Sequence, residues 1–190
     1  MSQTELATFG AGCFWGVEKS FKKKFGQKLK RAQVGYAGGH SENPSYRQVC
    51  SGSTGHAEAL QVEYDPKELD FPTLVDFFYR SHDPTTKDRQ GNDRGTQYRS
   101  AIFYHNDEQK KLAEEITEKV RPHFGKAGIA TTIEPIGKFW TGEDYHQAYL
   151  DKNPHGYECA THFERSWDQI DQLYGPGLKA YFNRAINSVF

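Results

Sequence analysis

The stretch LATFGAGCFWGVEKSFKKKF, residues 6–25, sets out the first unit of the fold. Its first four residues form a short apolar-rich run that predicts a β-strand. Gly10 and Gly12 then mark a tight turn. After the turn, apolar side chains recur at helical spacing between charged residues, at Phe14, Val17, Phe21 and Phe25. The stretch therefore predicts a strand, a turn and a helix, with Cys13 where the turn meets the helix.

The apolar patterns that follow continue this alternation. Strands are predicted over 32–36, 60–64, 98–104 and 130–134, and helices from Pro72 through Phe78, from Asn106 through Val120 and, in a shorter form, from Thr141. Asn106 is followed three residues later by Gln109, which is a capping-box pattern. The order strand, helix, strand, strand, helix, strand is that of a ferredoxin-like sandwich. We therefore expect an α+β fold, a two-layer α/β sandwich with a mainly antiparallel mixed sheet and long functional loops.

Two long segments and the C-terminal tail differ from this periodic part. Residues 37–58 and 81–97 are rich in Gly, Asp, Asn, Tyr and His, and long segments of this kind inside a compact domain are usually functional or disordered. Residues 167–190 form an amphipathic tail that we expect to pack on the body or to contact a partner. Because there is no internal repeat or linker, we expect one domain over 1–190, with a core at about 5–160 and a C-terminal extension at about 161–190.

Composition and charge restrict the possible functions. The 190 residues carry 24 Lys and Arg against 25 Asp and Glu, and this balance argues against general binding to nucleic acid or to a membrane surface. No apolar run approaches the roughly 20 residues that span a bilayer, and the N-terminus has no secretory-signal pattern. Three cysteines do not suggest a disulfide scaffold. We expect a cytoplasmic monomer in which any disulfide is transient.

Cys13 is the first candidate for chemistry. A cysteine at a helix N-terminus meets unpaired N–H groups and the positive end of the helix dipole, and both favour the nucleophilic thiolate. Gly10 and Gly12 leave room for a substrate to approach the sulfur. The alternative is a buried structural cysteine. Tandem Phe14 and Trp15 at a turn indicate a lined site instead, so Cys13 is interpreted as a nucleophile.

The other two cysteines have different contexts. Cys159 lies in NPHGYECATHF, where Pro154 and Gly156 indicate an irregular segment. A cysteine there is suited to attack an oxidised Cys13, although an incidental surface thiol is the alternative. Cys50, in YRQVCSG, is interpreted as structural or as a bystander.

A set of polar residues could serve the same site. Glu58 opens the strand predicted over 60–64, and a carboxyl near apolar walls would have a raised pKa and could act as an acid. Asp93 and Tyr98 precede another strand, and Tyr46 lies in the first long segment. A protonated carboxyl and two phenols are donors that could surround one substrate oxygen. Each residue alone is more often solvated or at the core edge, so the hypothesis rests on the set.

Other kinds of protein are compatible with these thiols. The cysteines and the eight histidines show no Cys-x2-Cys or His-x3-His pair with the spacing of a zinc site, so no metal is predicted. A Cys-His acyl transferase does not depend on sequence spacing, and its histidine could be His56, His82, His146 or His162. A redox-regulated binding module, in which oxidation of Cys13 and Cys159 changes a surface, needs no catalysis.

Five longer motifs resemble those of a known family. They are GCFWG (12–16), GYAGG (35–39), PSYRQVCSGSTGHAEALQVEYDP (44–66), HDPTTKDRQGNDRGTQYRSAIFY (82–104) and YHQAYLDKNPHGY (145–157). Together they resemble the A-type peptide-methionine (S)-S-oxide reductases, the methionine sulfoxide reductase A family. The resemblance implies a single catalytic domain that reduces the S epimer of methionine sulfoxide, free or in proteins, as a repair reaction. It implies no metal or flavin cofactor.

The resemblance also implies a role for each matched residue. Cys13 attacks the sulfoxide sulfur, and Glu58 donates a proton to its oxygen. The other positions bind the substrate: two aromatic residues wall the pocket for its methyl group, two tyrosines hold the oxygen, and one carboxylate orients the site. The two aromatic residues are Phe14 and Trp15, the two tyrosines are Tyr46 and Tyr98, and the carboxylate is that of Asp93.

The implied cycle leaves Cys13 as a sulfenic acid, which a second cysteine resolves as a disulfide that thioredoxin reduces. Several family members have Gly-Tyr-Cys followed by a glycine-rich segment and another cysteine. Here Glu158 separates Tyr157 from Cys159, and no cysteine lies beyond it. The resemblance therefore implies a direct Cys13–Cys159 disulfide. It assigns no catalytic role to the extension after Phe163.

Overall fold

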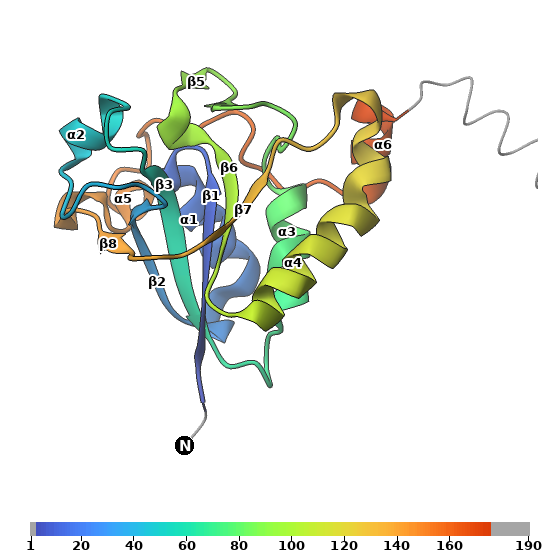
Figure 1. The fold of residues 1–190 in the computed structure, drawn as a ribbon, viewed down its shortest axis with the longest axis horizontal. Helices are drawn as coiled ribbons and strands as arrows, with labels where there is room; N and C mark the ends of the chain where they lie inside the picture. The colour runs from blue at the N-terminus through green and yellow to red at the C-terminus, as the bar shows by residue number, and fades with distance from the viewer. Residues whose placement is uncertain (1–2, 176–190) are drawn as a thin grey trace, which may run out of the picture.

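The computed structural model describes residues 3–175, which form a six-stranded sheet with helices packed on it (Figure 1). The strands of the sheet are β1 (Glu5–Ala11), β2 (Leu29–Ala37), β3 (Ala57–Tyr64), β6 (Ser100–Tyr104), β7 (Thr132–Pro135) and β8 (Trp140–Thr141). Their order across the sheet is β7-β6-β1-β3-β2-β8. Within the described residues only β6 and β7 pair in parallel, so the sheet is mixed and mainly antiparallel, as predicted.

The four longest strands have the ferredoxin-like arrangement. β1 is joined to β2 by helix α1 (Phe14–Phe25) and the 3₁₀ turn η1 (Gly26–Lys28), and β3 is joined to β6 through α3 (Phe71–Arg80). In the sheet these strands stand in the order β6-β1-β3-β2. β1 and β2 both run antiparallel to β3 between them and are therefore parallel to each other. The predicted α+β sandwich is confirmed, with β7 and β8 added at the two edges.

One face of the sheet is covered by helices and carries the main core. Phe9 on β1 stacks on Phe78 of α3 with 5.3 Å between ring centroids, and it packs 5.4 Å from Phe21 of α1. Phe21 in turn meets Phe77 edge-on at 5.0 Å. Burial of each such side chain contributes about 1.5–3 kcal/mol. The helical spacing of apolar residues in α1 thus explains why this helix lies on the sheet.

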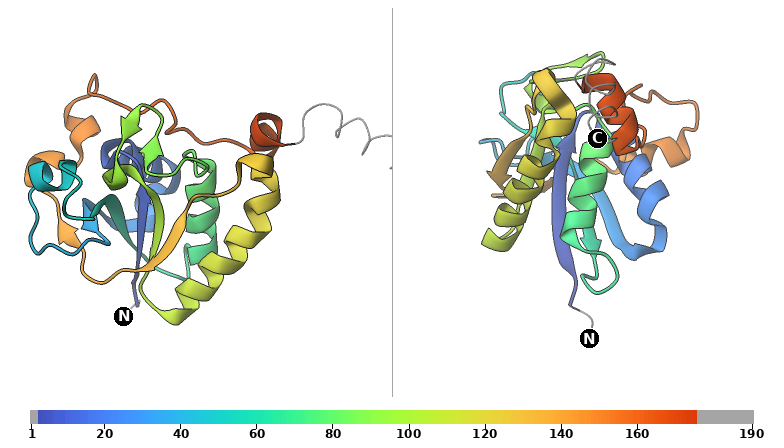
Figure 2. Two further views of the ribbon diagram at one scale, coloured as in Figure 1. Left: turned by 45° about the horizontal axis from the view of Figure 1, so that its top comes forward. Right: turned by 90° about the vertical axis from the view of Figure 1, so that its right-hand side faces the viewer.

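A third helix, α4 (Asp107–Val120), lies beside α3 (Figures 1 and 2). Thr117 on α4 shares a 2.6 Å hydrogen bond with the Tyr79 hydroxyl on α3. The predicted capping box is half correct. Asn106 accepts from the Gln109 N–H at 2.8 Å, but the Gln109 side chain accepts at 3.0 Å from the N–H of the residue before Asn106. The side-chain amide of Gln109 also donates to a carbonyl of β1, so the glutamine ties the helix start to the sheet.

The opposite face of the sheet carries small side chains under a crossing loop. Residues 136–139 run from β7 at one edge to β8 at the other and pass over this face (Figure 1). Ile136 and Phe139 pack there on Phe103 and on a group of buried alanines. The alanines are Ala37, Ala57, Ala59 and Ala101. Their methyl side chains leave the space that the loop fills.

The segment after the crossing loop differs from the prediction. The sequence predicts a short helix from Thr141, but Thr141 belongs to β8 and pairs with β2. The Gln147 side chain extends this edge, because its amide bonds to the N–H and the C=O of Val34 at 2.9 and 2.8 Å. The chain then makes the 3₁₀ turn η4 (Asp144–His146) and the one-turn helix α5 (Tyr149–Lys152). Pairing at the sheet edge overrides the local helix-start pattern.

The two long segments contain short elements. They hold α2 (Tyr46–Cys50), the two-stranded hairpin of β4 (Arg89–Gln90) and β5 (Asp93–Arg94), and the 3₁₀ turn η2 (Thr96–Tyr98). A capping box of Ser45 and Gln48 starts α2. Because Tyr98 belongs to η2, the strand predicted over 98–104 begins two residues later, at Ser100. The strand predicted over 130–134 is likewise displaced, to the bounds of β7.

The described chain ends in helix α6 (Trp167–Tyr174), which packs on the 3₁₀ helix η3 (Arg121–Ala127). Its Ile170 is buried, and Trp167 meets Phe124 edge-on at 6.3 Å between centroids. The predicted packing of the amphipathic tail is confirmed for α6, and the remainder of that prediction lies outside the described residues. Among residues 3–175, no helix combines the length and apolarity needed to cross a membrane.

Candidate active site

Cys13 lies where β1 ends and α1 begins, as the N-cap residue of the helix. Gly12 makes the preceding turn with a φ of +90°, in the left-handed region that favours glycine. A Cβ at this position would also collide with the side chain of Gln90. Glycine therefore allows the β4–β5 hairpin to approach the helix start, and only 7% of Cys13 remains exposed.

Glu58 reaches the same helix start from β3. Its side chain is 1% exposed, and its carboxyl accepts a 3.0 Å hydrogen bond from the backbone N–H of Phe14. Burial raises the pKa of Glu58 to about 8; the Phe14 N–H opposes this shift, and the charge of Asp93 adds to it. At neutral pH most of the carboxyl is therefore protonated and able to donate. This agrees with the raised pKa expected from the sequence.

The Cys13 thiol is neutral in this arrangement, which corrects one expectation. Burial raises the pKa of Cys13 well above its ordinary value, and the charge of Glu58 raises it further. The N–H groups of Trp15 and Gly16 lower it, as a helix start should, but by less. The prediction of a resting thiolate is therefore wrong, because a local motif reveals the helix start but not the burial of the sulfur.

Phe14 and Trp15 form an aromatic cluster beside the thiol. Phe14 is fully buried, and its ring lies 6.5 Å from that of Tyr46, centroid to centroid. The Trp15 indole stacks on Tyr149 of α5 at 3.7 Å. Its N–H donates a 3.0 Å hydrogen bond to Nδ1 of His146. Both rings are thus fixed by their neighbours, as the wall of a specific pocket requires.

Tyr46 and Tyr98 bring neutral hydroxyls to the same region. Burial raises the pKa of both phenols far above the ordinary value, and the charge of Glu58 adds to each shift. The charge of Asp93, on β5, acts on Glu58, Cys13 and Tyr98 alike. The structure therefore brings these five residues within electrostatic reach of one another, from the N-cap of α1 and from α2, β3, β5 and η2.

Three nearby contacts were not expected. The Tyr157 hydroxyl donates to Asp93 at 2.9 Å, and Glu143 accepts from the Tyr46 N–H at 2.9 Å. Cys50, interpreted as a bystander, shares a hydrogen bond with the Tyr46 hydroxyl. The four-residue spacing of Tyr46 and Cys50 on one helix could have indicated their contact. Nothing local marks the other two, which join residues 64 and 97 positions apart.

Cys159 is buried, with 3% of its surface exposed. Its thiol donates to the carbonyl of Gln90 at 3.5 Å and lies 3.2 Å from the Thr161 hydroxyl. Cys13 and Cys159 are both free thiols in this structure. The imidazole Nε2 of His162 lies 2.7 Å from the last carbonyl of β1, so this segment packs beside the turn that carries Cys13. The segment is irregular, as predicted, but the alternative of a surface thiol is wrong.

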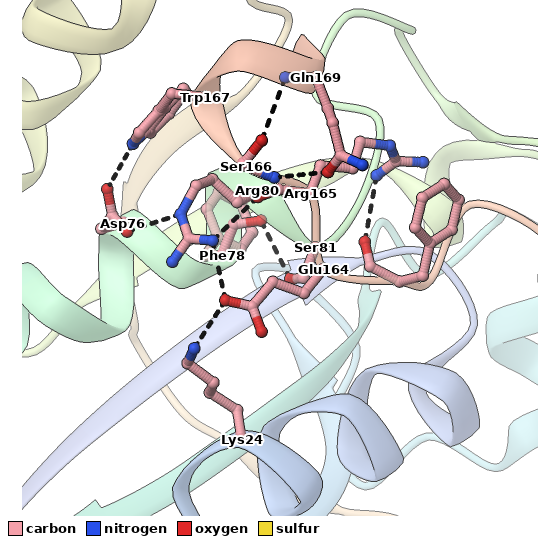
Figure 3. Close-up of polar contacts among 11 residues, drawn as sticks. Lys24, Asp76, Phe78, Arg80, Ser81, Glu164, Arg165, Ser166, Trp167 and Gln169 are labelled. Atoms are coloured by element: carbon pink, nitrogen blue, oxygen red, sulfur yellow. Dashed lines mark hydrogen bonds and ion pairs between the residues drawn. The ribbon is translucent and has the colours of Figure 1, made fainter.

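The chain beyond Cys159 is fastened to α3 and α1 by the polar network in Figure 3. Arg80, the last residue of α3, donates to the Glu164 carboxylate at 2.8 Å and to the Arg165 carbonyl at 2.9 Å. The N–H of Arg165 donates back to the Arg80 carbonyl at 2.9 Å. Lys24 of α1 pairs with Glu164 at 2.6 Å. The Cys159 segment is thus anchored on its downstream side.

The four candidate histidines have partners other than the Cys13 thiol. His56 accepts from the N–H of Gly39, and His82 bonds to a backbone carbonyl of α3 and to Ser100. His146 and His162 have the contacts given above. Within residues 3–175, no group of three His, Cys, Asp or Glu side chains is arranged to hold a metal ion.

A buried thiol beside a protonated carboxyl and neutral phenols, on a ferredoxin-like sandwich, defines a thiol enzyme whose site suits an oxygen-bearing substrate. Comparison with known proteins gives the family. The family model described as peptide methionine sulfoxide reductase matches residues 5–175. The chain belongs to this family of oxidoreductases, and the acyl-transferase and binding-module alternatives find no support.

Individual relatives agree. A probable peptide methionine sulfoxide reductase of Schizosaccharomyces pombe is 47% identical over 170 residues, which is 88% of this chain and 99% of the relative. The MsrA of Methanothermobacter thermautotrophicus is 52% identical over 155 residues, 81% of this chain and 90% of the relative. Among solved structures, reduced Mxr1 of Saccharomyces cerevisiae is similar with a TM-score of 0.83 and 46% identity, covering 86% of this chain and 93% of Mxr1.

Proposed function

We propose that this protein reduces methionine S-sulfoxide, free and in proteins, to methionine, with Cys13 as nucleophile and Glu58 as acid. The observation that carries the proposal is the buried Glu58 carboxyl at the start of α1, which is mostly protonated at neutral pH. A sulfoxide oxygen is a strong hydrogen-bond acceptor and a poor leaving group. An acid beside it therefore lowers the barrier most while the bond between the two sulfurs forms.

In the first step, the Cys13 sulfur attacks the sulfoxide sulfur while Glu58 protonates the oxygen. The S–S bond gives an adduct that carries the hydroxyl group on the substrate sulfur. This hydroxyl group then moves to the Cys13 sulfur while the substrate S–O bond and the S–S bond break, which leaves Cys13 as a sulfenic acid and releases methionine as the thioether. The thiol proton passes to Glu58, so the step consumes no net proton. Cys13 is oxidised by two electrons and the sulfoxide is reduced by two. The buried neutral thiol is compatible with this step, because its proton is needed to restore the acid.

The neighbouring side chains would hold the substrate. The hydroxyls of Tyr46 and Tyr98 bind the sulfoxide oxygen, and a preorganised donor of this kind contributes roughly 3–4 kcal/mol to transition-state stabilisation. Phe14 and Trp15 wall the pocket for the methyl group, and Asp93 orients the site. A pocket that accepts one methyl group and one oxygen in separate places is chiral, which accounts for selectivity between epimers.

For the second step we propose that Cys159 resolves the sulfenic acid. Its sulfur attacks the Cys13 sulfur, water leaves, and a Cys13–Cys159 disulfide forms. A thioredoxin dithiol then reduces this disulfide and becomes oxidised itself, so that no metal or flavin cofactor takes part. In support, one structure of the similar Mxr1 is a complex with Trx2, with a TM-score of 0.61 and 33% identity, covering 87% of this chain and 92% of Mxr1.

We further propose that the chain works as a cytoplasmic monomer and a single catalytic domain, with its core at about 5–160. The extension at about 161–190 would serve the fold rather than the chemistry. The burial of Ile170 in α6 against the body supports this division for the part that the structure describes.

The test is an epimer-resolved assay. The parent protein and Cys13→Ser are each given methionine S-sulfoxide or R-sulfoxide, with thioredoxin and its reductase or with dithiothreitol. We expect the parent to reduce the S epimer with either reductant, and Cys13→Ser to reduce neither epimer. Full activity of Cys13→Ser, or equal rates on both epimers, would contradict the proposal.

A further inference from the structure

One carboxylate joins two sides of the substrate pocket. Glu143 lies between β8 and η4, and its Oε1 accepts from the backbone N–H of Tyr46 at 2.9 Å. Its Oε2 accepts from the Tyr36 hydroxyl at 2.8 Å and lies 3.3 Å from Nε2 of His146. His146 in turn accepts from the Trp15 indole. Glu143 thus contacts the first residue of α2 directly and the Trp15 wall through His146.

The hydrogen bond from Trp15 fixes the protonation of His146. An indole N–H can only donate, so Nδ1 of His146 must be the unprotonated acceptor in the 3.0 Å contact with Trp15. The remaining proton is therefore on Nε2, which lies 3.3 Å from Oε2 of Glu143 but makes no hydrogen bond there, so its attraction to the carboxylate is electrostatic. His146 is fully buried, and its ring packs 5.0 Å from Phe14 and 4.5 Å from Tyr46 between centroids. The imidazole has no room to turn without disturbing both rings.

We propose that Glu143 and His146 are positioning residues for the substrate pocket: neutral His146, packed against Phe14 and Tyr46 and facing Glu143, fixes the Trp15 indole that receives the substrate methyl group. This inference rests on the proposed function for the role of Trp15. Neither residue touches the reacting atoms, so both act through Trp15 and Tyr46. Because His146 acts on the Trp15 wall, the expected consequence of losing His146 is weaker substrate binding rather than slower chemistry.

The charged groups around His146 make the contact sensitive to acid. Burial lowers the pKa of His146, and the charge of Glu143 partly opposes this. The phenols of Tyr46 and Tyr145 pack on His146, and that of Tyr36 bonds to Glu143; burial raises the pKa of each, so all three stay neutral. Burial opposes ionisation of Glu143, but hydrogen bonds from Tyr36 and from the Tyr46 N–H bring its pKa below the ordinary value. If acid protonates Nδ1, this nitrogen becomes a donor that faces the N–H donor of the Trp15 indole, and the hydrogen bond between them is lost.

The kinetic test uses His146→Phe, which keeps a packed ring and removes the acceptor. We expect KM for methionine S-sulfoxide with dithiothreitol to rise about tenfold, which corresponds to about 1.4 kcal/mol, while kcat changes less than about threefold. His146→Asn retains an acceptor near the position of Nδ1 and should recover most of the affinity. The matched control is His123→Phe, because His123 stacks on the distant Trp167 at 4.5 Å. An unchanged KM in His146→Phe, or an equal rise in the control, would overturn the proposal.

A measurement without substrate separates this inference from the proposed function. The indole N–H signal of Trp15 in a ¹⁵N NMR spectrum, identified by its loss in Trp15→Phe, should move as pH falls and His146 becomes protonated. Glu143→Gln should shift that titration to lower pH, since the carboxylate charge favours the imidazolium. In His146→Asn the titration should vanish. A Trp15 indole signal that is the same in His146→Asn as in the parent protein would overturn the positioning role even if the enzyme is active. Absence of sulfoxide reduction together with a normal titration would overturn only the proposed function.

Discussion

The two thiols of the proposed cycle lie in opposite kinds of environment, although both are buried, at 7% exposed for Cys13 and 3% for Cys159. Cys13 stands at the end of a sheet strand and is surrounded by groups from α1, α2, β3, β5 and η2. Cys159 lies in an irregular segment, and its thiol bonds to the Gln90 carbonyl and the Thr161 hydroxyl. The site of the first step is therefore assembled before substrate arrives, whereas the second step requires Cys159 to leave its own contacts.

The irregular segment is held at both ends. Upstream, α5 is fixed by the stacking of Tyr149 on Trp15 at 3.7 Å and by the burial of Leu150. Downstream, the Arg80 network holds Arg165 (Figure 3). Cys159 lies seven residues after Lys152 and six before Arg165, near the middle of the tethered loop. Between these ends the segment has further contacts, from Tyr157 to Asp93 and from His162 to the last carbonyl of β1, so Cys159 must move within the stretch between them.

The largest effect should come from removing the second thiol alone. Cys159→Ser leaves the Cys13 site intact, so one equivalent of methionine should form at the parent rate. Multiple turnover with thioredoxin should fall to almost nothing, because the sulfenic acid has no resolving thiol. Rapid-quench measurement of the methionine formed per enzyme molecule checks both the single turnover and the loss of multiple turnover. Unchanged cycling would assign resolution to Cys50 or to an external thiol.

The next effect concerns the acid. Glu58→Gln keeps an acceptor for the Phe14 N–H but cannot donate a proton of comparable acidity, so the first turnover should slow about 10²–10³-fold. In the parent, the rate should fall as pH rises through about 8, where the carboxyl loses its proton. The pH profile of Glu58→Gln should lack that limb. A variant that retained the limb would exclude Glu58 as its source.

The same carboxyl should make stability depend on pH. Folding raises the pKa of Glu58 from 4.5 to about 8, so the folded protein binds a proton over this range that the unfolded chain releases. The stability linked to this proton is present in full below about pH 4.5 and is lost as pH rises through about 8. Urea unfolding at pH 5 and pH 9 should therefore show Glu58→Gln gaining stability relative to the parent at the higher pH. Glu114→Gln, at an exposed position on α4, is the control and should show no such gain.

Sequence periodicity predicted the elements that bury one continuous face. The apolar spacing from Phe14 to Phe25 gives α1, because every turn of that helix meets the sheet. It could not predict β8, which has two residues and exists only because β2 offers an unpaired edge. The helix expected from Thr141 failed for the same reason. A short strand at a sheet edge forms where a neighbouring strand is available to pair with it, so the local sequence pattern does not predict it.

In the candidate site, too, some features were predictable from the sequence and others were not. Motifs identified Cys13, Glu58 and the pocket residues, and the structure brings them together. The protonation of Cys13 was not predictable, since it depends on burial by elements distant in sequence. The contact of Trp15 with His146 spans 131 residues, and no local spacing marks it. Reacting groups could be read from motifs, whereas the groups that hold them could not.

The smallest effect should come from weakening the Arg80 contacts on the downstream side of Cys159. It tests whether these contacts keep Cys159 close to Cys13 or hold it in its buried position. Arg80→Ala removes the side-chain contacts to Glu164 and to the Arg165 carbonyl. By chain statistics, the midpoint of a flexible loop samples roughly three times more volume when the loop is attached at one end than when it is attached at both ends. Because α6 still packs on η3, the Cys13–Cys159 disulfide should form more slowly by less than about threefold, with the first turnover unchanged. Lys30→Ala breaks an exposed pair with Glu68 and is the control. Faster disulfide formation in Arg80→Ala would mean that the anchor restrains Cys159 in its buried position rather than keeping it close to Cys13.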